Sequence, residues 1–178
     1  MEIMVDIETL STAPTAAVVS IGLAAFNREE IIATLGIFIN AEDIDGHLDP
    51  ATVKWWMQQP NCAQAMKGTT SRLVAVNEVL AFFGRFAITG VWANSPSFDL
   101  VILKEWWKRR DTGPLPWTHK LERDYRTLRA LAKELNIETP EWTGQAHDPV
   151  VDAENQARTV ISILQQLHDL QNVSGALR

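Results

Sequence analysis

Aliphatic and polar residues alternate at the start of the chain. The odd positions from Ile3 to Ile7 are aliphatic, and the even positions after Met4 are the carboxylates Asp6 and Glu8. Successive side chains of a β-strand point to opposite faces, so this pattern predicts a strand that buries one face and presents both carboxylates on the other. A two-residue step along a strand covers about 6–7 Å, which lets the two carboxylates share a cation.

Four later segments also have the pattern of strands. Residues 18–26 and 31–39 are rich in β-branched side chains and are separated by a polar turn at 27–30, which predicts an antiparallel hairpin. Together with the first strand they form a three-stranded antiparallel meander. Residues 91–94 are a short apolar run between a glycine and a Ser-Pro turn, typical of a buried strand, and residues 119–124 are the candidate for a fifth strand.

Helical periodicity and capping residues predict five helices. We expect them at residues 50–57, 71–87, 98–107 and 127–135, and from residue 149 toward the C-terminus. Asp49 and Asp148 each precede a proline and are the expected N-caps of the first and last of these helices. The order of elements predicts an α/β fold with a central mixed five-stranded sheet flanked by helices.

Length and composition limit the protein class. The chain has 178 residues, of which 46% are hydrophobic, and this predicts a single domain over residues 1–178, with residues 171–178 as a flexible tail. It lacks a run of about 20 apolar residues and a secretory signal pattern, so we expect a cytoplasmic protein without a membrane partner. Cys62 is the only cysteine, which excludes an intramolecular disulfide and a thiolate-cluster zinc site.

Charge is distributed unevenly along the chain. The net charge is −6, yet residues 104–133 contain nine basic and four acidic side chains, which leaves −11 for the remainder. This asymmetry is typical of a protein with one basic flank and an acidic centre, rather than of a protein that coats a duplex. The simpler interpretation, that these cations only solvate helix surfaces, stays open for each of them.

Three further residues are candidates for chemistry, although each has an ordinary explanation. Asp99 lies where the predicted fourth strand gives way to a helix, a place where α/β sheets collect ligand-binding groups, but aspartate is also a common N-cap. Asp152 lies in the first turns of the last helix, where a carboxylate is favourable without any function. His147 precedes it by five residues and can face the same space. An isolated Asp-x-Glu pair, such as Asp6 and Glu8, is also usually a solvated strand face.

Taken together, these residues form a specific pattern. The order Asp-x-Glu, Asp, His-x4-Asp, with Met4-Val5-Asp6-Ile7-Glu8-Thr9-Leu10 at the start and Asn94-x3-Phe98-Asp99 in the middle, resembles the DEDDh (DnaQ-like) exonucleases over residues 2 to about 165. The likeness is strongest to the phage-type DexA-like exonucleases. It is carried by Thr52, Trp55-Trp56, Gln59, residues 91–94, residues 123–127, and Gln156-Ala157. One departure is Asp148-Pro149, where the group usually has Asn-Ala; both pairs can begin a helix.

The resemblance implies a ribonuclease H-like fold and a 3′→5′ exonuclease that releases 5′-mononucleotides. In the family pattern, Asp6, Glu8, Asp99 and Asp152 hold two divalent cations, Mg²⁺ or Mn²⁺, which prefer oxygen ligands. His147 is then the general base that deprotonates the attacking water, a role suited to imidazole.

The resemblance also suggests substrate contacts. Thr9 and Leu10 are expected to seat the terminal nucleotide, Leu10 as a side-chain wedge. Phe98 either stacks on a base or belongs to the core. Arg123 and Arg126 are expected to bind phosphates. Among the seven tryptophans, Trp55 and Trp56 are the candidates for a base platform.

The expected partner is the 3′ end of a nucleic acid, single-stranded, with DNA and RNA both open. A homodimer is a further expectation, based on the basic flank and exposed tryptophans. Three alternatives are weaker. An inactive end-binding module gains nothing from a cluster of carboxylates near phosphate. Another ribonuclease H-like phosphohydrolase does not need His-x4-Asp, and a structural protein leaves the five-residue pattern unexplained.

Overall fold

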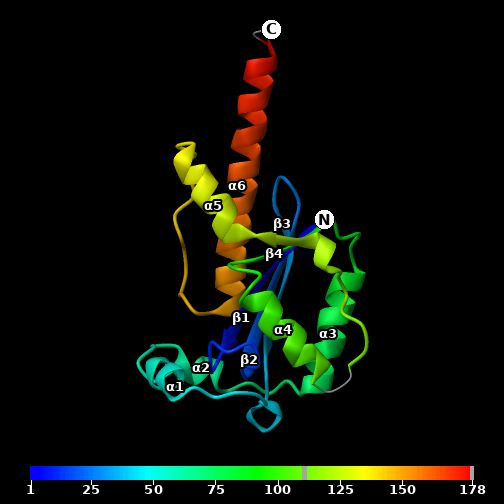
Figure 1. The fold of residues 1–178 in the computed structure, drawn as a ribbon, viewed down its shortest axis with the longest axis vertical. Coiled ribbons are helices and arrows are strands. Elements are labelled where there is room, and N and C mark those ends of the chain that lie inside the picture. Colours follow the sequence, from blue (N-terminus) through cyan, green and yellow to red (C-terminus); the bar gives the residue numbers. More distant parts are fainter. Residues whose placement is uncertain (110–111, 177–178) are drawn as a thin grey trace.

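The structure, a computed structural model, describes residues 1–109 and 112–176. A five-stranded sheet with the order β3-β2-β1-β4-β5 lies at its centre (Figure 1). The strands are β1 (Glu2–Thr9), β2 (Val18–Phe26), β3 (Ile31–Phe38), β4 (Gly90–Ala93) and β5 (Glu122–Asp124). The first three pair antiparallel, and β4 joins β1 and β5 in parallel. The mixed sheet with an antiparallel meander is therefore confirmed.

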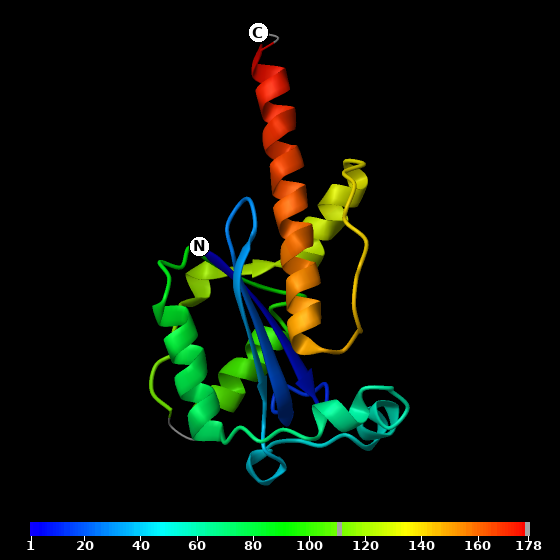
Figure 2. The same ribbon diagram turned by 180° about the vertical axis from the view of Figure 1, so that it is seen from behind.

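Helices cover both faces of this sheet. They are α1 (Pro50–Trp56), α2 (Cys62–Ala65), α3 (Arg72–Gly84), α4 (Asp99–Lys108), α5 (Tyr125–Glu134) and α6 (Pro149–Ala176), with 3₁₀ turns at Ala41–Asp43 and His119–Leu121. Figures 1 and 2 show α3 and α4 on one face and α5 and α6 on the other, with α1 and α2 beyond the end of β1. No described helix is long and apolar enough to span a membrane.

The two faces of β1 pack against different helices. Ile3, Val5 and Ile7 belong to the main core with residues of α3 and α4, whereas Met4 packs against Ala153 and Ala157 of α6. We predicted one buried face, but α6 covers the second one as well. As a consequence, the carboxylates of β1 face the first turns of α6 and are largely withdrawn from water.

The start of α6 lies unusually close to the sheet. Gly22 of β2 is the register partner of Asp6, and a Cβ atom at Gly22 would lie only 1.9 Å from the carbonyl oxygen of Pro149. A Cβ atom at Gly36, its neighbour on β3, would lie 2.6 Å from a methyl group of Val150. These two adjacent glycines therefore leave space on the sheet surface, and the first turn of α6 packs into it.

Some boundaries differ from the prediction. α3 ends at Gly84 rather than near residue 87, and residues 119–121 form a 3₁₀ turn, so that β5 is only three residues long. Asp148 caps α6 as expected, because its Oδ1 accepts the N–H groups of Val150 and Val151 at 3.0 and 3.2 Å. α6 extends through Ala176; residues 177–178 of the expected tail lie outside the described residues.

Candidate active site

Five side chains predicted to be functional meet at one cleft. Asp6 and Glu8 lie near the carboxyl end of β1, Asp99 is the first residue of α4, Asp152 lies in the first turn of α6, and His147 belongs to the preceding loop. All five line a cleft of about 380 Å³. Asp99 is therefore not the N-cap of α4; that position is occupied by Phe98, and no side chain caps this helix.

The four carboxylates are buried beside one another. Between 4% and 9% of each residue is exposed. Burial, followed by the charges of Asp99, Glu8 and Asp152, raises the pKa of Asp6 well above its usual range. Burial and the same kind of repulsion raise the pKa of Glu8 to about 8, and burial raises the pKa of Asp99 to about 7. Such a cluster stabilises bound protons or cations, because either neutralises the repulsion.

Two of these carboxylates are held by hydrogen bonds from α6 and its leading loop. Gln156 Nε2 donates to Asp6 Oδ1 at 2.8 Å, and the backbone N–H of His147 donates to Asp152 Oδ2 at 2.9 Å. Burial raises the pKa of Asp152, and this N–H group opposes the shift. Asp152 Oδ1 is buried and has no hydrogen bond of normal geometry to a described residue, although the Trp142 side chain lies near enough to Asp152 to oppose the rise of its pKa. Its free lone pairs are what a cation ligand needs.

The donor set fits a divalent cation. Glu8, His147 and Asp152 each offer one ligand atom, and these three atoms lie within 4.8 Å of one another. Asp6 and Asp99 add carboxylates to the same cleft, and hard cations such as Mg²⁺ and Mn²⁺ prefer oxygen ligands. The cleft is therefore a candidate metal site, in which His147 lies close enough either to bind a cation or to accept a proton.

The sequence matches a known domain family over nearly its whole length. Residues 1–164 match the 3′-5′ exoribonuclease Rv2179c-like domain. The chain belongs to this family. It is accordingly a 3′-5′ exonuclease. A comparison with curated protein sequences found no match.

Several solved structures share this fold. The nuclease domain of 3′hExo, described as a DEDDh family member and bound to rAMP, has a TM-score of 0.65 and 11% identity over 93% of this chain and 92% of its own. Exonuclease X, in complex with 5′ overhanging duplex DNA, has a TM-score of 0.60 and 16% identity over the same shares. S. pombe Pop2p, in an Mg²⁺- and Mn²⁺-bound form, has a TM-score of 0.57 and 13% identity over 91% of this chain and 82% of its own.

His147 of this exonuclease is fixed by contacts on both sides of its backbone. Its φ of +63° lies in the left-handed region, which is uncommon for a residue with a side chain. Asn61 Nδ2 donates to its carbonyl oxygen at 2.6 Å, and the ring lies edge-on to Trp55 with centroids 4.8 Å apart. Sequence reasoning missed Asn61, because nothing in its local pattern connects it to a residue 86 positions away.

A clamp on α6 holds the loop that leads to His147. Asn155 Oδ1 accepts the backbone N–H of Thr143 at 3.1 Å, and Asn155 Nδ2 donates to the Thr143 carbonyl at 2.7 Å. The neighbouring Trp142 lines the exonuclease cleft and is 44% exposed. Trp142 and Gln156 were also missed as site residues. Only Gln156 carries a sequence signal, since it follows Asp152 by four residues and shares its helix face.

A second, more apolar hollow adjoins the carboxylates. It measures about 370 Å³ and is lined by Thr9, Trp55 and Phe98 together with Glu8, and Phe98 also lines the carboxylate cleft. Trp55 is 39% exposed there. These placements agree with the expected positions of Thr9, Phe98 and Trp55, whose contacts with substrate stay predictions.

Two other residues of this region have structural roles. Leu10 packs in a small apolar cluster with Ala17 and Val19, and its expected contact with substrate as a wedge stays a prediction. Trp56 lines the apolar hollow but is only 1% exposed, and its indole N–H donates to the carbonyl of Thr9 at 2.9 Å, so it anchors the strand end.

The two predicted phosphate-binding arginines lie apart. Arg126, at the start of α5, lines the exonuclease cleft and donates to the Asn94 carbonyl at 3.3 Å. Arg123 instead donates to the carbonyl of Thr89, next to the opposite end of β4, and lines neither hollow at the site. Side chains on a strand and on the following helix diverge, which the sequence spacing did not reveal.

The exposed tryptophans lie at the site. Of the seven, five are buried, and the exposed pair, Trp55 and Trp142, line the two hollows described above. They therefore give no separate apolar surface for the expected homodimer. Self-association through the basic flank stays a prediction.

Proposed function

We propose that this exonuclease uses two divalent cations, Mg²⁺ or Mn²⁺, to remove 5′-mononucleotides from the 3′ end of a single-stranded nucleic acid. The observation that carries the proposal is the convergence of four buried, mutually repelling carboxylates and His147 at one cleft. A carboxylate cluster of this kind is costly without a cationic partner. RNA is the substrate we favour over DNA, because the family is described by exoribonuclease activity.

Asp6, Glu8, Asp99 and Asp152 are the proposed cation ligands. Bound cations neutralise the phosphate oxygens, lower the pKa of the attacking water and stabilise the departing 3′ oxygen. Hydrogen bonds already hold two of these proposed ligands in position. Gln156 holds one oxygen of Asp6, and the N–H of His147 holds one oxygen of Asp152, which leaves the second oxygen of Asp152 available.

His147 accepts the proton of the attacking water in this proposal. Its nitrogen lies within 4.8 Å of ligand oxygens of Glu8 and Asp152, so a water bound between them is within reach. Trp55 limits the rotation of the imidazole, and Asn61 holds the backbone. A base that is already oriented avoids the cost of ordering during the reaction.

The apolar hollow beside the carboxylates is the proposed seat of the 3′-terminal nucleoside. Phe98 lines both this hollow and the cleft, and therefore lies at the boundary between base and phosphate. Trp55 offers a half-exposed ring for stacking, an interaction worth roughly 1–3 kcal/mol per base. Arg126 provides a positive charge at the phosphate.

A cleavage assay tests the proposal. Linear single-stranded RNA and DNA of equal sequence, and a circular single strand, are incubated with the protein and Mn²⁺. We expect stepwise shortening of the linear strands from the 3′ end, faster for RNA, with 5′-mononucleotides as products and the circle intact. Asp152→Asn should abolish cleavage, and Asp169→Asn, the same change at an exposed position of α6, should not. Cleavage of the circle, or full activity in excess chelator, would contradict the proposal.

A further inference from the structure

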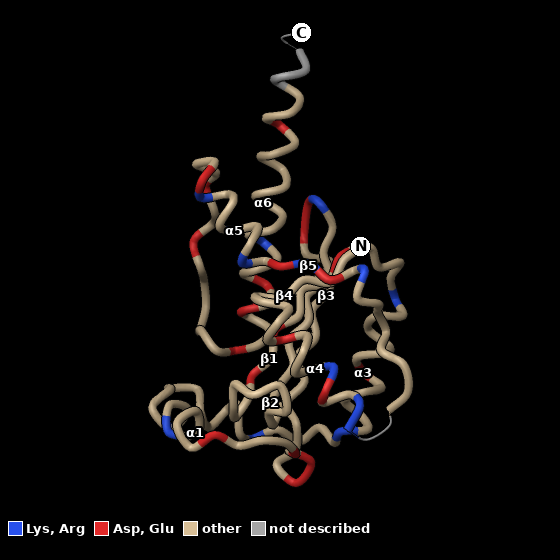
Figure 3. The backbone as a smooth tube through the Cα atoms, viewed as in Figure 1, with Lys and Arg blue, Asp and Glu red and all other residues tan. Residues whose placement is uncertain are grey.

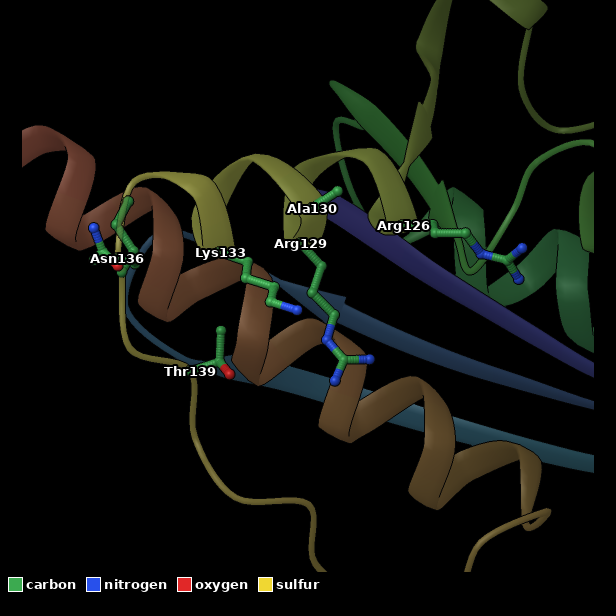
Figure 4. Close-up of a pocket in the computed structure, with 7 residues that line it drawn as sticks. Arg126, Arg129, Ala130, Lys133, Asn136 and Thr139 are labelled. Carbon is green, nitrogen blue, oxygen red and sulfur yellow. The ribbon is translucent and has the colours of Figure 1, made fainter.

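One face of α5 concentrates positive charge outside the catalytic cleft. Arg126, Arg129 and Lys133 follow the helical spacing of one face and are all exposed. They border a hollow of about 630 Å³, which the loop after α5 closes with Asn136 and Thr139. Figure 4 shows Arg129 and Lys133 projecting to one side of α5, and Arg126 extending from the start of the helix.

None of these cations forms an ion pair with a described residue, and only Arg126 lies near a carboxylate, that of Asp99, whose pKa its charge lowers. Ion pairs are formed by other basic residues of the described chain, namely Arg72, Lys104, Lys108, Arg109 and Arg158. In a protein of net charge −6, three neighbouring cations, of which Arg129 and Lys133 have no ion pair with a described residue, repel one another and attract an anion. Figure 3 shows the basic positions on α5, close to the acidic ones at the start of α6.

The basic hollow adjoins the catalytic cleft. Arg126 lines both spaces. The loop between α5 and α6 lines both as well, with Thr139 in the hollow and Trp142 in the cleft. This loop is tied to α6 at two points, through Asn155 near the cleft and through Gln166, whose Nε2 donates to the carbonyl of Glu138 at 2.8 Å. The wall facing α5 is therefore formed before substrate binds.

We propose that this face of α5 binds the phosphates of the substrate strand upstream of its 3′ end, an inference that rests on the proposed function. Arg126 and Lys133 are seven residues apart, which corresponds to about 10 Å along a helix. A stacked strand advances about 3.4 Å per nucleotide, so the track spans about three nucleotides. The side chains contact phosphates and read no base, which makes the contact independent of sequence.

The proposal predicts a dependence on substrate length and on salt. A dinucleotide occupies only the cleft, whereas a strand of twelve nucleotides reaches Arg129 and Lys133. Each phosphate contact with a single strand contributes about 0.7 to the slope of log affinity against log salt. Arg129→Gln combined with Lys133→Gln should therefore reduce this slope by about 1.4 and weaken binding of the twelve-nucleotide strand roughly tenfold or more at low salt.

The experiment measures KM and kcat for the dinucleotide and for the twelve-nucleotide strand. Strand binding is measured by fluorescence anisotropy with Asp152→Asn protein. We expect the double variant to raise KM for the twelve-nucleotide strand, to leave kcat unchanged and to leave the dinucleotide unaffected, which also reports an intact fold. Arg129→Lys with Lys133→Arg keeps both charges and should behave as wild type. Lys120→Gln, in the same basic segment but outside α5, is the matched control.

Other outcomes separate the two proposals. Equal losses for both substrates, or no loss for either, would overturn the phosphate track while the exonuclease activity stands. Length-dependent binding that the double variant removes, in a protein that cleaves neither substrate, would support the track and refute the proposed function. Unchanged strand binding with lost binding to anionic vesicles would assign this face to a membrane surface instead.

Discussion

The Asp152 side chain has a structural function and a proposed catalytic one. One of its oxygens accepts the N–H of His147 and so stabilises the left-handed conformation of that residue, and the other is buried and free. One oxygen of Asp6 is likewise held by a hydrogen bond, from Gln156. Buried carboxylates ordinarily need full hydrogen bonding. The incomplete satisfaction here indicates that cations provide the missing partners.

Removing the His147 imidazole should show whether it acts as a general base or as a cation ligand. We expect His147→Ala to lower the single-turnover rate by roughly 10²–10⁴-fold, the usual effect of losing a positioned acid or base, with little change in Mn²⁺ or substrate affinity. His119→Ala, an exposed histidine in the 3₁₀ turn before β5, should change neither. A loss of Mn²⁺ affinity as large as the loss in rate would show that His147 is a cation ligand.

At the residue scale, the sequence predicted site residues that together form an unusual combination of side chains. It missed site residues of types that also occur elsewhere in the chain. Alternation on a strand and spacing at a helix start made Asp6, Glu8, His147 and Asp152 candidates, but only the family resemblance assigned them a role. Trp142 resembles any other tryptophan until the fold places it in the cleft. For Leu10 the likeness predicted a wedge, which stays a prediction, whereas its packing with Ala17 and Val19 is a structural role that the sequence did not indicate.

At the scale of elements, the site depends on how closely α6 approaches the sheet. Asp6 lies opposite Gly22, and the first residues of α6 occupy the space that a side chain at Gly22 would fill. The same helix carries Asp152 and Gln156 and therefore sets their distance from β1. The glycine determines the geometry of the site, although it contributes no functional group.

Gly22→Ala should consequently impair both stability and catalysis. A Cβ atom 1.9 Å from the Pro149 carbonyl must displace backbone, and overpacking typically costs about 1–3 kcal/mol. A displaced α6 moves Asp152 relative to Asp6, so we expect lower Mn²⁺ affinity and rate in protein that still folds. Chemical denaturation and metal titration measure the two effects.

Gly84 provides the matched control for this substitution. It is the last residue of α3, and a Cβ atom there would meet nothing within 4 Å. Gly84→Ala should leave activity unchanged and stability equal or slightly higher, since alanine favours helix over glycine. If both variants behaved alike, close packing at Gly22 would not be what positions α6.

The prediction of elements succeeded where periodicity and caps agree and failed where tertiary contacts decide. Asp148 with Pro149 marks the start of α6, and the hairpin of β2 and β3 follows from its β-branched runs. β5 is short because its only pairing partner in the sheet, β4, has four residues. That limit comes from a neighbour remote in sequence, which no local pattern contains.

At the scale of the whole molecule, folding brings together charges that the unfolded chain keeps apart. The acidic centre lies between the sheet and α6, and the basic flank lies beside it on α5. Bringing the carboxylates together opposes folding when they are ionised and unneutralised. The stability of the protein should therefore depend on pH and on divalent cations in a linked way.

In the absence of cations, we expect stability to fall as the pH rises. The carboxyl pKa values lie at about 4 in an unfolded chain. In the folded protein, burial and neighbouring charges raise the pKa of Glu8 to about 8, and burial raises that of Asp99 to about 7. Between the unfolded pKa and these raised folded pKa values, the folded state binds more protons than the unfolded state. The free energy of unfolding therefore decreases with increasing pH. Thermal unfolding in chelator from pH 5 to pH 8 measures this decrease.

Divalent cations should reverse the trend, because they replace the protons that the cluster loses. Mn²⁺ is then expected to raise the Tm more at pH 8 than at pH 5, where it competes with bound protons. Asp6→Asn combined with Glu8→Gln removes two of the repelling charges, and should raise the Tm of the cation-free protein at pH 8 and flatten its pH dependence. A Tm that rises from pH 5 to pH 8 in chelator, or a double variant with an unchanged slope, would mean that the four carboxylates are not the groups that couple stability to pH.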